Sequence, residues 1–76
     1  MPKAANTAEL GVVGSTVRYY REQRGLTQEQ LGARAGLVTS TIVKVEAEDV
    51  SPGFETTCKI ADALGVTTDA LRRRVV

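Results

Sequence analysis

Three hydroxyl residues and a lysine form the part of this sequence best suited to bind another molecule. The hydroxyls are Thr39, Ser40 and Thr41. In a helix, Lys44 lies one turn after Thr41 on the same face, whereas Ile42 points the other way, toward a core. Hydroxyls can bond to bases, phosphates or bridging waters, and a lysine can reach a guanine edge or a phosphate. The pattern therefore predicts a helix with one buried side and one exposed side that can bind another molecule.

Few other residues of the chain are of the types that carry out catalysis or bind metals. The chain has no histidine, no tryptophan and a single cysteine, Cys58, which excludes an internal disulfide and a Cys/His zinc site. No nucleophile–base pair is evident either, and so small a chain has little room for a substrate pocket. We expect no enzyme, no cofactor and no metal. Cys58 is interpreted as a small core residue rather than a redox sensor.

Length and composition indicate one small soluble domain. The chain has 76 residues, of which 42% are apolar and 25% charged. A domain of this length has a small core and marginal stability. The apolar runs are too short to span a membrane, and no signal peptide is evident. A cytoplasmic protein is the expectation.

Charge is unevenly distributed. The formal net charge is only +1, which is low for a nucleic-acid-binding protein. Residues 1–25 carry a charge of about +2, residues 26–53 about −2 and residues 54–76 about +1, because the middle segment holds Glu48 and Asp49 and the last one holds Arg72–Arg74. Any surface that binds an anion must therefore be small and formed by a few basic groups.

Apolar spacing predicts an all-α domain of five helices. Their expected ranges are 9–24, 28–35, 39–47, 54–64 and 69–74. Residues 1–8 are expected to form a flexible arm, residues 9–74 the domain, and residues 75–76 a tail. Two short helices joined near Gly36 give the spacing of a helix-turn-helix within residues 27–46.

Local signals mark most of the helix ends. Asn6 or Thr7 would cap the first helix, and Thr27 with Gln30 would form a capping box for the second. Thr67 or Thr68 would cap the last helix. Glycines at 25, 36 and 65 would end three helices.

Helical spacing also predicts which side chains are buried. The expected core residues are Leu10, Val13, Val17, Tyr20, Leu31, Ala35, Ile42, Val45, Phe54, Thr57 or Cys58, Ala61 and Leu64. Val66, Leu71 and Val75–Val76 are interpreted as an apolar patch for a second subunit.

Four motifs together resemble one known family. They are R-G-L-T-Q-E-Q-L at 24–31, A-G at 35–36, S-T-I-V-K-V-E at 40–46 and I-A-D-A-L-G-V at 60–66. Taken together, they make the chain similar to the Cro/C1-type (XRE, lambda-repressor-like) helix-turn-helix family over about residues 10–72. The resemblance implies a compact five-helix DNA-binding domain that acts as a homodimer on a two-fold operator, most often as a transcriptional repressor.

The resemblance also implies roles for particular residues. The glutamine that opens the second helix, Gln28, would contact a backbone phosphate, and Arg21 would pair with Glu46. The helix that begins near Thr39 would enter the major groove. The full candidate DNA-binding set is Thr27, Gln28, Val38, Thr39, Ser40, Thr41, Val43 and Lys44.

Two departures from the family pattern stand out. Val38 occupies the place where a serine commonly caps the third helix, so the cap must come from elsewhere or be missing. The loop after that helix carries Glu48 and Asp49, which would repel phosphates unless the loop is turned away. These carboxylates favour an alternative, a protein-interaction helix-turn-helix of the antitoxin or accessory-subunit kind, with a protein partner. The basic Arg72–Arg74 run is either solvated, on the DNA backbone or at a dimer interface.

Overall fold

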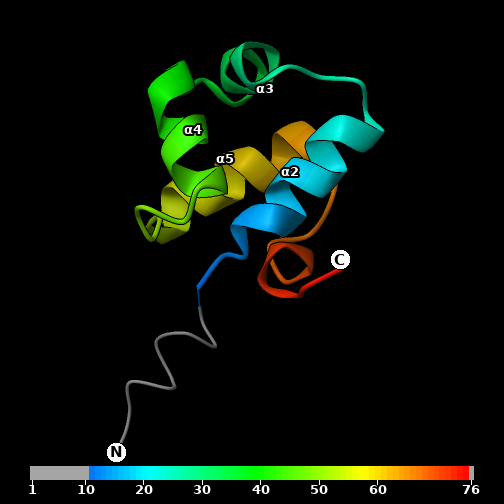
Figure 1. The fold of residues 1–76 in the computed structure, drawn as a ribbon, viewed down its shortest axis with the longest axis vertical. Helices are drawn as coiled ribbons and strands as arrows, with labels where there is room; N and C mark the ends of the chain where they lie inside the picture. Colours follow the sequence, from blue (N-terminus) through cyan, green and yellow to red (C-terminus); the bar gives the residue numbers. More distant parts are fainter. Residues whose placement is uncertain (1–10, 76) are drawn as a thin grey trace, which may run out of the picture.

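The computed structural model describes residues 11–75, and its regular elements over that range are all helices. Its α-helices are α2 (Gly14–Gln23), α3 (Gln28–Ala35), α4 (Thr39–Glu46) and α5 (Phe54–Leu64), followed by a 3-10 helix, η1 (Ala70–Arg72). Helices α3 and α4 lie together at one end and η1 at the other, with α2 and α5 crossing between them (Figure 1). The all-α prediction is confirmed for these residues. The expected arm, residues 1–8, lies outside them.

The start of α2 differs from the expectation of a helix from Glu9. Residues 11–13 are not helical, and α2 begins at Gly14 with Val13 as its N-cap. The reason is a contact distant in sequence: the Val13 N–H donates to the carbonyl of Leu71 at 2.8 Å. This bond ties the chain to η1 just before the helix starts. The caps expected from Asn6 or Thr7, like Leu10, lie outside the described residues.

Local signals do determine the ends of α3. The Thr27 hydroxyl accepts from the Gln30 N–H at 3.0 Å, and the Gln30 side chain accepts from the Thr27 N–H at 2.9 Å. This is the predicted capping box. Gly36 ends the helix in the left-handed region at φ 72°, which a glycine adopts without a steric penalty.

Helix α5 has the predicted bounds but a different buried stripe. The prediction that Phe54 is buried is wrong, since it is 73% exposed. Phe54 is the first residue of α5, and the buried stripe begins one turn later, at Thr57, and includes Ile60, which was missed. The Thr57 hydroxyl donates to the Gly53 carbonyl at 2.8 Å, so its burial leaves no polar group unpaired.

The last predicted α-helix, over 69–74, is instead the short η1. The Thr67 hydroxyl accepts from the Ala70 N–H at 3.1 Å, as expected of a cap. The chain is extended again at Arg73, whose carbonyl accepts a hydrogen bond from the Thr16 hydroxyl. This contact with α2 explains why the helix stops early. Leu71, expected in a surface patch, is fully buried.

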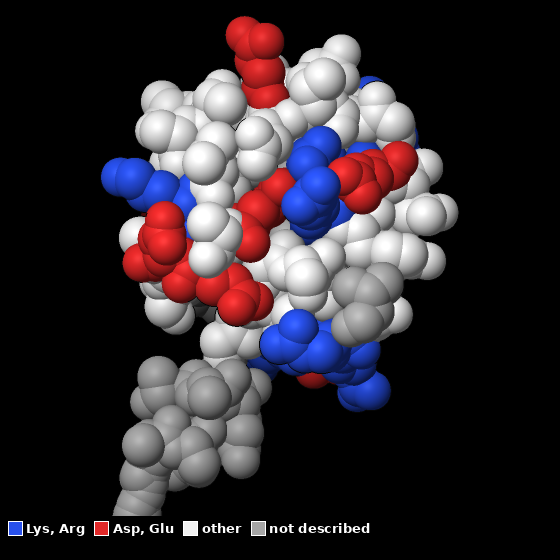
Figure 2. All heavy atoms as spheres, in the orientation of Figure 1, with Lys and Arg blue, Asp and Glu red and all other residues white. Residues whose placement is uncertain are grey.

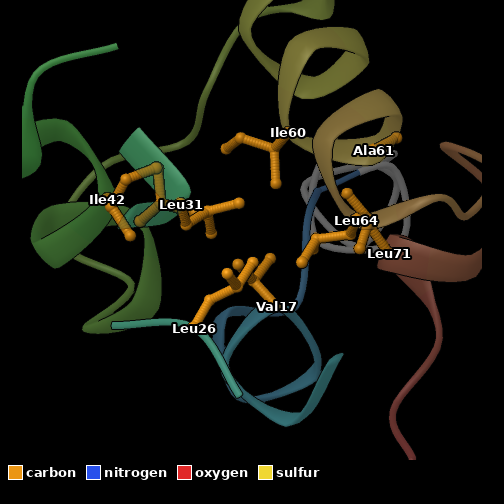
Figure 3. Packing of buried hydrophobic residues seen from close by; sticks show 9 residues of the cluster. Val17, Leu26, Leu31, Ile42, Ile60, Ala61, Leu64 and Leu71 are labelled. Carbon is orange, nitrogen blue, oxygen red and sulfur yellow. The ribbon is translucent and has the colours of Figure 1, made fainter. Parts of the chain in front are cut away.

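Every helix contributes to a single core. Its residues are Val17, Leu26, Leu31, Ile42, Val45, Ile60, Ala61, Leu64 and Leu71. Figure 3 shows these side chains converging on one space from all the elements of the described chain. Burying each large side chain contributes roughly 1.5–3 kcal/mol, so α3 and α4 depend on α2 and α5 for their stability. No helix in residues 11–75 is long and apolar enough to cross a membrane.

Candidate nucleic-acid interface

Helix α4 presents one polar face to solvent. Thr39, Ser40 and Lys44 are exposed, and Thr41 is half-buried, whereas Ile42 is fully buried. Val43 lies on the exposed side as well. The described structure therefore brings the hydroxyls and the lysine onto a single accessible surface, with the apolar side of the helix fixed in the core.

The first turn of α4 has no side-chain cap. Val38 is its N-cap, makes no side-chain hydrogen bond and is 67% exposed. The buried stripe of α4 starts only at Ile42, so Val38 lies outside the core and is accessible at the start of the helix. An uncapped helix start keeps backbone N–H groups available to an anion or a base edge beside Thr39.

A buried ion pair joins the other end of α4 to α2. Arg21 Nε donates to Glu46 Oε2 at 2.6 Å and Nη2 donates to Oε1 at 3.1 Å, with the side chains only 11% and 5% exposed. Arg21 Nη1 also donates to the Leu26 carbonyl at 2.7 Å. The hydrogen bond that Arg21 donates to Glu46 outweighs desolvation and raises the pKa of Arg21, so the guanidinium is charged at every ordinary pH.

Gln28 takes part in the same network, which the sequence did not reveal. Its Nε2 donates to Glu46 Oε1 at 3.1 Å. One N–H of the side-chain amide is thus held by Glu46 rather than free for a phosphate. Its Oε1 and second N–H make no hydrogen bond within residues 11–75. Finding this bond requires the positions of α3 and α4 in three dimensions.

Thr27 has a structural task in the described chain, since its hydroxyl oxygen is an acceptor in the capping box of α3. The hydroxyl hydrogen can still be donated to a ligand. Thr27 is exposed, so a capping role and a contact role are compatible.

A shallow hollow separates α2 from the start of α3 and the exposed side of α4. Its volume is about 370 Å³. It is lined by Arg18, Arg21, Gln28, Val43, Glu46 and Ala47. Arg18 was absent from the sequence-based candidates, because no signal along the chain places it beside Val43.

The acidic loop after α4 is partly folded back onto the protein. Glu48 Oε2 accepts from the Gly14 N–H at 2.8 Å, at the start of α2. Glu48 has φ 62°, an unusual backbone conformation for a residue with a side chain. One of the two carboxylates thus has a partner within the fold, which lessens the repulsion expected from this loop.

Charges of both signs lie on the face of the molecule drawn in Figure 2. Figure 2 shows Lys and Arg side chains in separate groups with Asp and Glu between them, rather than a continuous basic surface. Lys44 forms no ion pair with any residue of the described range, whereas Arg18 pairs with Glu22. An anion would thus be attracted at a few points only.

Comparison with known sequences places the chain in a family. The helix-turn-helix family model matches residues 17–71, which span α3, α4 and most of the core. The chain belongs to the Cro/C1-type helix-turn-helix family. It is similar to the immunity repressor protein of Bacillus phage phi105, with 34% identity over 59 residues, covering 78% of this chain and 41% of the repressor. The chain thus matches less than half the length of that relative.

Two solved structures of similar proteins have the same fold. The P22 c2 repressor, in complex with a synthetic operator, superposes with a TM-score of 0.75 and 25% identity over 79% of this chain and 91% of that one. The restriction-modification controller protein C.AhdI from Aeromonas hydrophila superposes with a TM-score of 0.74 and 28% identity, covering 88% and 97% of the two chains.

Proposed function

We propose that this protein is a sequence-specific DNA-binding transcriptional regulator that places α4 in the major groove. The observation that carries the proposal is the exposed face of α4, where Thr39, Ser40 and Lys44 lie on a helix that Arg21 and Glu46 fix to α2. A major groove admits one α-helix, and residues near its N-terminus reach the base edges. Family membership and the similarity to two repressors support this function.

Repression by occlusion of a promoter is the mode we favour, with two copies on a two-fold site. Two recognition helices would then lie about 34 Å apart, one turn of DNA. Two exposed apolar side chains, Val50 in the segment between α4 and α5 and Phe54 at the start of α5, support a contact between copies. Analytical ultracentrifugation of the wild type and Phe54→Ser tests this point: a monomeric wild type, free and on DNA, would contradict it.

Selection of bound sites from random DNA tests the function itself. Wild-type protein should enrich one motif at low salt, and the triple variant Thr39→Ala/Ser40→Ala/Lys44→Ala should not. The melting temperature of the variant should stay near that of the wild type, because these side chains are exposed. Glu55→Ala/Lys59→Ala removes an exposed ion pair on α5 and serves as the matched control. Folded wild-type protein that selects no sequence would exclude the proposal.

A second candidate function is a protein-interaction helix-turn-helix that binds DNA weakly. The near-neutral charge and the exposed Asp49 favour it. Affinity purification after nuclease treatment distinguishes the two functions. A stoichiometric protein partner together with failed site selection would support the second one.

A further inference from the structure

We propose that the hollow between α2, α3 and α4 binds a phosphate of the DNA backbone and that Arg18 is its principal cation. This inference rests on the proposed function, because it concerns DNA already bound along α4. It adds Arg18, which lies on α2, to the DNA-binding residues inferred from the sequence. Those residues lie on α3 and α4 or directly before them.

The position of the hollow supports a backbone contact. Val43, on the exposed side of α4, and Gln28, the first residue of α3, both line it, and Arg18 lines it from α2. When α4 occupies the major groove, one of the strands that border the groove must pass beside its flank. The hollow lies on that flank, so a phosphate is the DNA group that meets it first.

Unused donors in the hollow match a phosphate. Arg18 makes a single hydrogen bond within residues 11–75, from Nε to Glu22 Oε2 at 3.1 Å, so its remaining N–H groups can bind oxygen. Gln28 has a second amide N–H that is not engaged in the described range. An arginine fork together with an amide is a suitable donor set for phosphate oxygens.

The acidic groups nearby do not prevent anion binding. Glu46 also lines the hollow, but both its oxygens accept bonds from Arg21, and its side chain is only 5% exposed. Its charge is therefore compensated inside the protein. Glu22 is exposed, as is its partner Arg18, at 55% and 65%, and an exposed pair of this kind is readily exchanged. Arg18 would leave Glu22 for the phosphate when DNA binds.

The test compares two exposed cations that each pair with a carboxylate four residues away. Arg18→Gln removes the proposed cation, and Lys59→Gln is the matched control, because Lys59 pairs with Glu55 on α5 and does not line the hollow. DNA affinity is measured by fluorescence anisotropy at several salt concentrations, on the selected operator and on an unrelated duplex. We expect Arg18→Gln to weaken binding to both, and to reduce the slope of log K against log salt by about 0.9, the value for one phosphate. Lys59→Gln should keep the wild-type slope.

A third variant tests the exchange of partners. Glu22→Gln should tighten binding to both duplexes, because Arg18 no longer has a competing carboxylate. An unchanged slope in Arg18→Gln, or a loss confined to the operator, would overturn the inference while leaving the proposed function intact. Failure of the wild type to select any site would instead overturn the proposed function. Circular dichroism melting of Arg18→Gln checks that the fold is retained.

Discussion

The Gly14 backbone N–H donates a 2.8 Å hydrogen bond to the carboxylate of Glu48, 34 positions later in the chain. Val13, the N-cap of α2, makes no side-chain hydrogen bond, so Glu48 does the work of the missing cap. Its negative charge also lies at the positive end of the helix dipole. The bond joins the start of α2 to the segment that follows α4.

Replacement of Glu48 should therefore destabilise the protein. We expect Glu48→Ala to lower the free energy of unfolding by about 0.5–2 kcal/mol, the usual cost of losing an N-cap. Glu48→Gly should cost less, because glycine adopts φ 62° without strain. Urea denaturation measures both. Asp49→Ala is the control, and an equal loss in that variant would show that the effect is not specific to the cap.

Gly14 should tolerate no side chain. A Cβ atom there would lie 2.5 Å from the carbonyl oxygens of Val45 and Glu46, at the end of α4. Both neighbours are backbone, so relief requires α2 and α4 to move apart, at a cost of roughly 1–3 kcal/mol. We expect Gly14→Ala to lower the melting temperature clearly. Gly53→Ala is the control, because it has open space around it and an ordinary φ of −72°.

Removing Arg21 should be among the most harmful changes. Arg21→Met leaves Glu46 as a nearly buried, unpaired carboxylate, which typically costs 3–5 kcal/mol. The double variant Arg21→Met/Glu46→Met should recover part of that loss, because no charge is then left unpaired. A double-mutant cycle by chemical denaturation gives the coupling. Additive single losses would contradict the interpretation.

The pH dependence of this pair follows from Arg21. Its pKa is raised by the Glu46 bond, so its contribution to stability is present below the unfolded pKa and is lost only as pH rises through the folded one. Since the ordinary pKa of a guanidinium already lies far above neutrality, titration of Arg21 should not change stability between pH 6 and 9. Unfolding curves across that range, compared with those of Arg21→Met, check this expectation.

An added cap on α4 should stabilise the protein. Val38 is exposed and makes no cap bond, so Val38→Ser gains an acceptor for the first turn without loss of core packing. We expect a gain of about 0.5–2 kcal/mol. Val43→Ser, an exposed position inside the same helix, should give no such gain. Thermal melting followed at 222 nm separates the two variants.

The elements whose ends depend on nearby residues could be predicted from the sequence. Helix α3 is bounded by the Thr27 capping box and Gly36, and both signals are local. The start of α2 is set by the carbonyl of Leu71 and the carboxylate of Glu48, which come from distant segments. Hydrophobic spacing cannot reveal such contacts, so the helix was predicted too long.

The same distinction applies to the candidate site. The exposed face of α4 follows from helical periodicity, since Ile42 and Val45 are buried and Lys44 is exposed. The bond from Gln28 to Glu46 and the place of Arg18 in the hollow depend on how three helices pack, which no motif records.

Leu71 should prove essential to the fold although it lies near the end of the chain. Its side chain is fully buried, and its carbonyl accepts from the Val13 N–H at 2.8 Å. We expect Leu71→Ala to cost about 2–5 kcal/mol, as large-to-small core changes do. In a domain of this size, that loss can unfold much of the population at 37 °C, and DNA binding would fall with it. Val75→Ala, at an exposed position four residues later, should leave the melting temperature unchanged, and comparable losses in the two variants would contradict the core role of Leu71.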